Sequence, residues 1–182
     1  MEPLDVRLRA LRLEDGEMVR QWRNSPLVAA GMITNHTITV DEHEAWLRAV
    51  LTSTTSRHWV ICAGGRPVGL VHLSAIDRVQ RHCTWGFYNA VMDLRGHGVM
   101  VAALTGVLDH AFGELGMDVV KAEVLEGNDA SLAVHRRLGF EVTDRRRGAV
   151  RRDATELDVI VLQLQSTDWR ERDRRGPTLA GS

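Results

Sequence analysis

Two glycines stand immediately before a long apolar stretch of the chain. Gly96 and Gly98 belong to the segment DLRGHGVM, residues 93–100, and the apolar stretch continues over residues 99–115. Because glycine weakens a helix interior, a pair of glycines here is typical of a helix entrance. A glycine-rich entrance also lets an anion approach the open N–H groups and partial positive charge of the helix N-terminus. The segment therefore predicts a tight turn or an anion-binding helix N-terminus, followed by a buried amphipathic helix.

The rest of the chain predicts an α+β fold around a mixed, mostly antiparallel sheet. Alternating apolar and polar residues indicate the strands, and capping residues followed by helical spacing indicate the helices. Gly64 and Gly65 predict a hairpin turn, whereas Gly86 inside a strand predicts a bulge or a close approach to the backbone. Strands are expected at residues 6–13, 58–63, 67–76, 82–91, 118–125, 140–147 and 156–165, and helices after Asp15, after Thr39 and at residues 99–115 and 128–138.

The composition excludes several classes of function. The 182 residues are 44% hydrophobic and 26% charged, with a net charge of −1. Nothing in that charge attracts a nucleic acid or a membrane, and no apolar run is long enough to span a bilayer. The two cysteines, Cys62 and Cys83, have no metal or redox spacing, which fits a reducing compartment. We expect a cytoplasmic protein with one domain at residues 1–165 and a polar, flexible C-terminal tail at residues 166–182. The oligomeric state stays open, with a homodimer among the options.

A second motif, NDASLAVHRRLGF at residues 128–140, combines a helix with a titratable side chain. Asn128 caps the predicted helix and Gly139 ends it. His135 titrates near neutral pH, so it can donate a proton to a leaving group. The alternative is that His135 is a packing or surface residue of this helix.

In this order and at this spacing, the two motifs resemble those of the GCN5-related N-acetyltransferases (GNAT). The resemblance extends over roughly residues 6–165 and includes the glycine-containing strand ahead of the first motif. It implies the GNAT fold, acetyl-CoA as co-substrate, direct acetyl transfer to an amine, and a backbone N–H near residues 87–89 that holds the oxyanion. The cofactor-binding residues that it implies are Tyr88, Asn89, Arg95, Gly96, His97, Gly98, Val99, Met100, Asn128 and Ser131.

The chain departs from the family pattern at the catalytic positions. Many members carry a tyrosine as general acid where this chain has His135, and a histidine can protonate the departing thiolate in the same way. The glutamate that commonly serves as base has no counterpart, because the strand segment TWGFY holds no carboxylate. The candidates for the base are Glu123 on the next strand, His43 and an ordered water relay. Met100 stands where members usually have glycine or alanine.

The N-terminal half narrows the resemblance. The segments WRN (22–24), GMIT (31–34), DEHEAWL (41–47), WGFY (85–88) and HAFGELG (110–116) resemble those of UDP-amino-sugar N-acetyltransferases of pseudaminic-acid-type pathways, which acetylate the 4-amino group of a nucleotide-linked sugar. The resemblance implies an acceptor pocket lined by Arg23, Met32, His43, Trp46 and Tyr88. A nucleotide sugar needs a cation for its diphosphate and flat apolar faces for its rings. Arg23, Trp46 and Tyr88 supply these, although Trp46 also fits a role in the core.

Other acceptors and another class of function stay open. The chain also resembles the branch that acetylates protein N-termini or ribosomal proteins, and an aminoglycoside or natural-product amine is a further possibility. Without the family's usual glutamate and tyrosine, a non-catalytic acyl-CoA-binding module is the alternative from another class. An arginine-rich segment either meets a phosphate group of a substrate or is simply solvated. Its members are Arg145, Arg146, Arg147, Arg151 and Arg152. No spacing typical of a metal site occurs.

Overall fold

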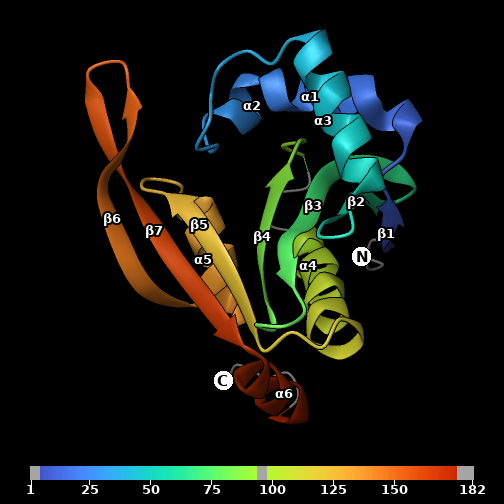
Figure 1. Cartoon of the computed structure of the whole chain (residues 1–182), viewed down its shortest axis with the longest axis vertical. Coiled ribbons are helices and arrows are strands. Elements are labelled where there is room, and N and C mark those ends of the chain that lie inside the picture. The colour runs from blue at the N-terminus through green and yellow to red at the C-terminus, as the bar shows by residue number, and fades with distance from the viewer. Residues whose placement is uncertain (1–4, 94–97, 176–182) are drawn as a thin grey trace.

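A seven-stranded sheet organises the chain (Figure 1). The computed structural model describes residues 5–93 and 98–175. Neighbouring strands follow the order β1-β2-β3-β4-β5-β7-β6, and the pairs are antiparallel apart from the parallel pair of β4 and β5. The strands are β1 (Val6–Ala10), β2 (Arg57–Ala63), β3 (Arg66–Asp77), β4 (His82–Asn89), β5 (Val119–Leu125), β6 (Glu141–Arg152) and β7 (Thr155–Gln165).

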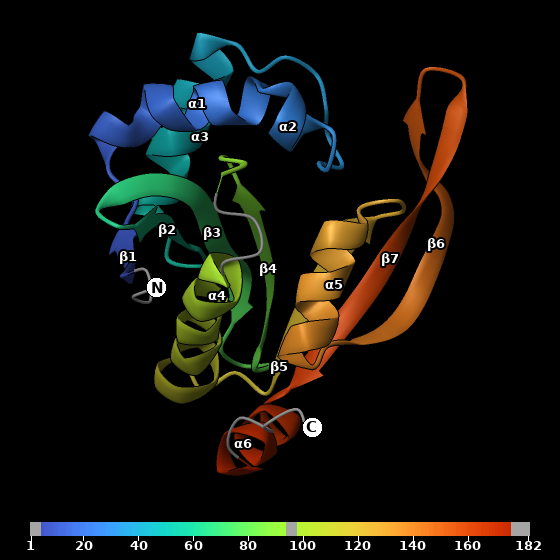
Figure 2. The ribbon, with the colours of Figure 1, turned by 180° about the vertical axis from the view of Figure 1, so that it is seen from behind.

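Helices cover both faces of this sheet, as the two opposite views show (Figures 1 and 2). They are α1 (Gly16–Asn24), α2 (Pro26–Ala29), α3 (Val40–Thr52), α4 (Val99–Asp109), α5 (Asp129–Leu138) and α6 (Ser166–Arg175), with a 3-10 turn at Leu13–Asp15 and a π turn at His110–Glu114. None of the helices within the described ranges is long and apolar enough to cross a membrane. The expected α+β architecture around a mixed sheet is confirmed.

The period-two alternation of the strands divides the core into two parts. Ile61 and Val71 belong to the larger cluster, which they form with α4 and α5. Val60 and Leu70, their neighbours in sequence, belong to a second cluster with α1, α2 and α3. Each helix layer therefore has its own hydrophobic contact with the sheet, and each can carry a different half of a site.

The parallel pairing between β4 and β5 is short. It runs from the pair His82 and Val119 to the pair Trp85 and Ala122. Beyond that point β4 continues beside β3 to Asn89, and β5 continues beside β7. Figure 1 shows the two strands diverging. The backbone groups that each strand turns toward the other therefore lack a partner in the sheet beyond Trp85.

Two sequence expectations need comment. Gly86 causes no bulge, because it stays in regular register opposite His72. The alternative of a close approach is confirmed, since a Cβ at residue 86 would lie 2.6 Å from Cε1 of His72.

The segment after β7, expected to be a flexible tail, continues as α6. Its Trp169 ring lies against Phe112, and the indole N–H donates to Asp109 at 2.8 Å. Residues 176–182 lie outside the described residues.

Asp15 connects the first strand to the first helix. Its carboxylate accepts two hydrogen bonds from the Arg9 guanidinium, both at 2.7 Å, and one from the Arg12 backbone N–H at 2.9 Å. The side chain is buried, and the hydrogen bonds from Arg9 lower the pKa of the Asp15 carboxyl group. This contact fixes the point at which the chain leaves the sheet edge to enter α1.

We expect Asp15→Asn to reduce the free energy of unfolding by about 2 kcal/mol at pH 7, because charged hydrogen bonds to Arg9 are lost. The native pKa lies below that of the unfolded chain, so this contribution is complete above about pH 4 and is lost as the pH falls further. Urea unfolding at pH 7 and pH 3 measures both effects, and equal stabilities at pH 7 would contradict the prediction. Glu17→Gln, which alters an exposed pair with Arg20, is the control and should leave the midpoint unchanged.

Candidate functional site

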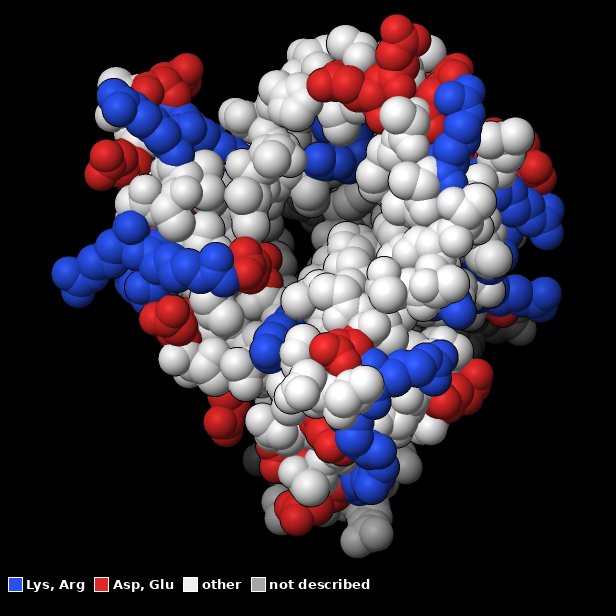
Figure 3. All heavy atoms as spheres, in the orientation of Figure 1, with Lys and Arg blue, Asp and Glu red and all other residues white. Residues whose placement is uncertain are grey.

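Two cavities open on either side of the gap between β4 and β5. The α3-side cavity has a volume of about 850 Å³ and is lined by residues of α1 and α3. The α4-side cavity, of about 830 Å³, is lined by the first residues of α4 and α5. Figure 3 shows the hollow between the two halves of the molecule. Six residues line both cavities, which therefore meet at the gap: Gly31, Met32, Phe87, Tyr88, Asn128 and Ser131.

Two backbone N–H groups of β4 face this gap. The Ala90 N–H donates to the Val68 carbonyl at 2.8 Å, so alternate residues of β4, counted back from Ala90, turn their backbone groups toward β3. Phe87 and Asn89 turn theirs the other way, where pairing with β5 has already ended at Trp85. N–H groups held in this way can stabilise negative charge that develops on a carbonyl oxygen.

The α4-side cavity contains the described part of the predicted cofactor loop. Gly98 is the N-cap of α4 with a φ of 73°, and among the described residues beyond its chain neighbours and the backbone of α4 no atom lies within 4 Å of the position that a Cβ would take. The N-terminus of α4 therefore borders open space, as an anion-binding helix end requires. Arg95, Gly96 and His97 lie outside the described residues. The other expected cofactor residues line this cavity: Tyr88, Asn89, Gly98, Val99, Met100, Asn128 and Ser131.

The α3-side cavity contains all five residues expected in the acceptor pocket, Arg23, Met32, His43, Trp46 and Tyr88. Trp46 is half-buried and its ring lies 5.0 Å from that of His43, centroid to centroid. Tyr88 belongs to the core cluster beneath α1 and α3, and its ring meets another tryptophan of that cluster edge-on. Trp46 and Tyr88 therefore pack in the core and line the cavity at the same time.

Buried polar atoms without partners gather around this cavity. Within the described residues, five cavity-lining side chains each have a buried nitrogen or oxygen with no hydrogen-bond partner: Arg23 Nη1, His43 Nε2, Ser56 Oγ, His58 Nδ1 and Tyr88 Oη. A buried polar atom left unpaired costs about 1–3 kcal/mol. Their concentration around one cavity indicates that the cavity is built for a polar ligand.

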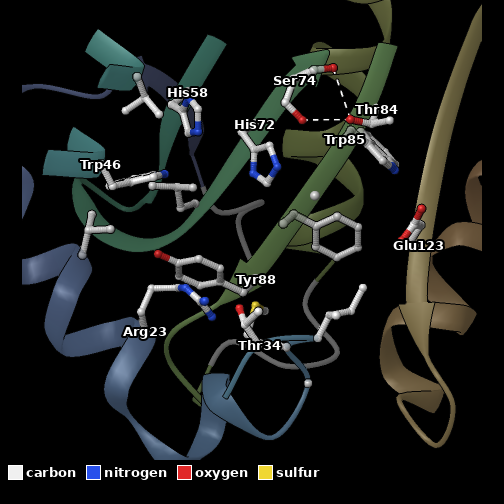
Figure 4. Close-up of a pocket in the computed structure, with 18 of the residues that line it drawn as sticks. Arg23, Thr34, Trp46, His58, His72, Ser74, Thr84, Trp85, Tyr88 and Glu123 are labelled. Carbon is white, nitrogen blue, oxygen red and sulfur yellow. Dashed lines mark hydrogen bonds between the residues drawn. The ribbon is translucent and has the colours of Figure 1, made fainter. Parts of the chain in front are cut away.

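Arg23 is the charged member of this group. Burial lowers the pKa of its guanidinium from the ordinary value, yet arginine remains protonated at neutral pH. Burial raises the pKa of the Tyr88 hydroxyl, which therefore stays neutral. Figure 4 shows Arg23 and Tyr88 side by side at the cavity. The cavity thus presents a half-buried positive charge beside neutral hydrogen-bonding groups.

The geometry of His135 differs from the role expected for it. The residue is 3% exposed and lies among the rings of Trp85, Phe87 and Phe140. Its Nε2 accepts a hydrogen bond from the Trp85 indole N–H at 3.1 Å, so the ring proton is on Nδ1, which donates to the Ser131 carbonyl at 2.8 Å. Burial lowers the pKa of His135, which keeps the ring neutral. With both nitrogens engaged, His135 has no free proton for a thiolate, and the geometry favours the packing alternative.

Glu123, the carboxylate candidate for the base, lines the α3-side cavity from β5. It lies one residue beyond the last pair with β4 and forms an ion pair with Arg146. Arg145 is likewise paired, with Glu126 and Asp158. The charges of these two arginines are therefore balanced by carboxylates on or directly after the neighbouring strands β5 and β7.

A contact that sequence analysis missed holds the chain between α2 and α3 over the site. The Arg152 guanidinium donates to the carbonyls of Ala30, at 2.8 Å, and Met32. The Asn128 amide donates to the Gly31 carbonyl at 3.4 Å. Residues that are about a hundred positions apart thus fix the segment that both cavities share. No local sequence pattern signals such a contact.

Sequence analysis also missed His58 and His72, whose rings stack in the α3-side cavity with centroids 5.1 Å apart. They lie on β2 and β3 at alternating positions that include Val60 and Leu70, which face α1 and α3. Histidine at an inward position of an otherwise apolar strand is the signal that identifies them.

A comparison with known families establishes the family of the chain. The model of the acetyltransferase (GNAT) domain matches residues 5–141. The chain belongs to the GNAT family. It is an acetyl-CoA-dependent N-acetyltransferase, and the resemblance found in its sequence is confirmed.

Individual relatives agree on the family but not on the acceptor. Acetyltransferase PseH of Campylobacter jejuni is 24% identical over 134 residues, which are 74% of this chain and 82% of that one. The putative ribosomal N-acetyltransferase YdaF of Bacillus subtilis is 28% identical over 105 residues, 58% of this chain and 57% of its own. Spermidine N-acetyltransferase of Vibrio cholerae, solved with CoA and spermine, superimposes with a TM-score of 0.82 at 17% identity, covering 91% of this chain and 98% of that one. The GNAT fold is thereby confirmed.

The α4-side cavity fits the co-substrate of a GNAT enzyme. An open helix N-terminus at Gly98 suits its pyrophosphate, and an N–H group of Phe87 or Asn89 in the gap suits its thioester carbonyl. Arg137 and Arg152 add positive charge to the same cavity wall. Acetyl-CoA supplies an activated acetyl thioester to this GNAT enzyme.

The packing role of His135 can be tested by substitution. We expect His135→Phe to lower the free energy of unfolding by about 2 kcal/mol, because the Trp85 N–H loses its acceptor inside the core. Trp85→Phe removes the same bond, so the double variant should lose less than the sum of the two single losses. Denaturant unfolding of the four proteins measures this. If stability is instead unchanged and turnover is abolished, His135 is the general acid after all.

For the cofactor loop, we expect Gly98→Val to weaken acetyl-CoA binding about tenfold, because a side chain would intrude on the helix N-terminus. Gly116→Val is a matched control, since Gly116 also has a positive φ, of 66°, and open space around it, but lines neither cavity. Calorimetric titration with CoA measures both. Equal affinities of the two variants would remove Gly98 from the cofactor site.

Proposed function

We propose that this GNAT enzyme acetylates a small amine that also carries an anionic group, and specifically the 4-amino group of a nucleotide-linked amino-dideoxy sugar. The observation that carries the proposal is the buried, unpartnered Arg23 Nη1 on the wall of the α3-side cavity. A half-buried guanidinium with an unpaired buried nitrogen favours an anionic partner, and a diphosphate or carboxylate on the acceptor supplies it.

The remaining walls of the cavity suit a ring-bearing ligand. Trp46 and Tyr88 offer aromatic faces, and the unpaired polar atoms of His43, His58 and Ser56 offer hydrogen bonds to hydroxyl groups. A cavity of about 850 Å³ is within the range of small-molecule sites and large enough for a nucleotide-linked sugar.

The same charge argues against other acceptors known among the relatives. A polyamine such as the spermine in the Vibrio cholerae structure is a polycation, and the buried Arg23 repels it. YdaF is named as a putative ribosomal acetyltransferase, and the amino group of a protein acceptor does not itself need a cation beside it. The branch that the N-terminal segments resemble, in contrast, uses a diphosphate-bearing acceptor.

The residues at the gap define the mechanism. One of the N–H groups of Phe87 and Asn89 stabilises negative charge on the carbonyl oxygen while the amine attacks. Of the residues that line both cavities, Tyr88 and Ser131 carry hydroxyl groups, and Tyr88 Oη is buried in the α3-side wall. We assign Ser131 as the proton donor to the departing thiolate. Neither cysteine is needed, because transfer is direct.

The state of the two cysteines suits a reducing compartment. Cys62 and Cys83 are both free thiols, and burial raises the pKa of Cys83 to about 12, so that thiol is inert. The proposed site of action is therefore the cytoplasm.

An acceptor panel tests the proposal. CoA release from acetyl-CoA is followed with a UDP-linked 4-amino sugar, an aminoglycoside, spermidine and a peptide with a free N-terminus. We expect turnover on the nucleotide sugar, with UDP as a competitive inhibitor against it. Preferential turnover of spermidine or the aminoglycoside, both polycations, would overturn the proposal.

We expect Arg23→Met to raise the KM for the anionic acceptor about 10- to 100-fold, because a charged hydrogen bond contributes about 1.5–3 kcal/mol. The affinity for acetyl-CoA should not change, since Arg23 lines the α3-side cavity alone. Arg20→Met is the control from the same helix, because Arg20 is paired with Glu17 and lies outside both cavities. Steady-state kinetics with both substrates varied measures the effect, and an unchanged KM would refute the anionic-acceptor assignment.

A further inference from the structure

Two histidines form part of the wall of the α3-side cavity without an evident structural task. His58 of β2 and His72 of β3 lie face to face, with 17° between their ring planes. Neither resembles His135, whose two nitrogens are both engaged: His58 Nδ1 is buried without a partner, and both rings line the cavity. Figure 4 shows His72 directed into the cavity, with Tyr88 and Arg23 across from it.

The position of His72 depends on Gly86, which is its direct partner in the β3–β4 register. A Cβ at residue 86 would lie 2.6 Å from Cε1 and 3.1 Å from Nε2 of His72. The imidazole therefore occupies the volume that a β4 side chain would otherwise take. Its Nε2 edge lies over β4 one residue before Phe87, whose N–H faces the gap.

The other titratable groups of this cavity are held elsewhere. Glu123 is paired with Arg146, and Glu42 accepts hydrogen bonds in the capping box that begins α3. His43 belongs to α3, on the outer wall, whereas His72 belongs to the strand adjacent to β4. His72 is therefore a titratable side chain without an ion-pair partner among the described residues, and the sheet places it near the gap.

We propose that His72 is the general base that takes the proton from the acceptor amine, a role that rests on the proposed acetyl transfer. The amine nitrogen forms the new C–N bond, and its surplus proton passes to a ring nitrogen of His72. The C–S bond breaks, and the thiolate leaves and is protonated. The imidazolium then returns its proton to solvent, so that one amine proton is exchanged for one thiol proton overall.

The surroundings of His72 keep its ring unprotonated in the free enzyme. Burial lowers its pKa to about 4, and the nearby charge of Arg23 contributes in the same direction. Burial and the neighbouring His72 lower the pKa of His58 to about 3. Both rings are therefore neutral at pH 7 and carry a free lone pair. An acceptor anion bound at Arg23 offsets that charge, so it raises the proton affinity of His72 when the amine is in place.

Turnover of variants tests the role of His72 directly. We expect His72→Gln to lower kcat about 100-fold while the affinity for CoA stays unchanged. In His72→Ala, added imidazole should restore a measurable part of kcat, which a merely structural role would not allow. His82→Gln is the matched control, because His82 is also a half-buried histidine of the sheet but lines neither cavity. A His72→Gln enzyme with wild-type kcat would overturn the proposal.

Gly86→Ala provides an independent test of the role of His72. The added Cβ must displace His72, so kcat should fall, whereas in a His72→Ala background the same change should have no further effect. Ring ¹⁵N NMR of histidine gives a readout other than activity. It should show His72 neutral at pH 7, with signals that shift on addition of UDP and in Gly86→Ala. A protonated His72 at pH 7, or equal losses from Gly86→Ala in both backgrounds, would contradict the proposal.

The kinetic comparison uses whichever amine of the panel the wild-type enzyme acetylates. A wild type that prefers a cationic acceptor therefore overturns the acceptor class and leaves the test of His72 intact. A wild type that prefers the nucleotide sugar, together with a fully active His72→Gln, overturns the base and leaves the acceptor class intact.

Discussion

The separation of β4 from β5 after the pair Trp85 and Ala122 is the constraint on which the site depends. A sheet that stays paired leaves no free N–H groups in its middle and no passage from one face to the other. An aromatic cluster packs on one face of the sheet at this point, where Trp85 stacks on Phe140 at 4.9 Å and the Phe87 ring lies 5.2 Å from that of His135. These contacts connect the end of the β4–β5 pairing to α5 and to the residue before β6.

His135 and His72 show how the same side chain takes opposite roles in one protein. His135 has both nitrogens engaged, by the Trp85 indole and the Ser131 carbonyl, and it therefore stabilises the aromatic cluster. His72 stacks on His58 and faces a cavity, so its nitrogens stay available to a ligand. Burial keeps both rings neutral, and protonation state therefore does not distinguish them. The distinction is whether the lone pair and the N–H already have partners, which only the assembled structure reveals.

The part of the fold that sequence predicts well is local. The Thr39–Glu42 capping box, the Asn128 cap and the left-handed Gly139 that ends α5, with φ of 93°, all follow from neighbouring residues and appear where expected. The partnership of His72 with Gly86 and the contact of Arg152 with Met32 join distant segments, and no short pattern encodes them. The role of a histidine depends on such partners. The motif position of His135 suggested an acid function because a motif does not show whether the two ring nitrogens already have hydrogen-bond partners.

Asn128 links the two halves of the site, and this explains why a helix cap lies in the wall of both cavities. Its Oδ1 accepts from the Ser131 N–H at 3.2 Å and so begins α5, while its Nδ2 donates to the Gly31 carbonyl. Gly31 must lack a side chain there, because a Cβ would lie 2.7 Å from that Nδ2. The segment over the α3-side cavity is therefore anchored to the helix that carries Ser131. A shift of either element disturbs the other, so the shapes of the two cavities depend on a shared set of contacts.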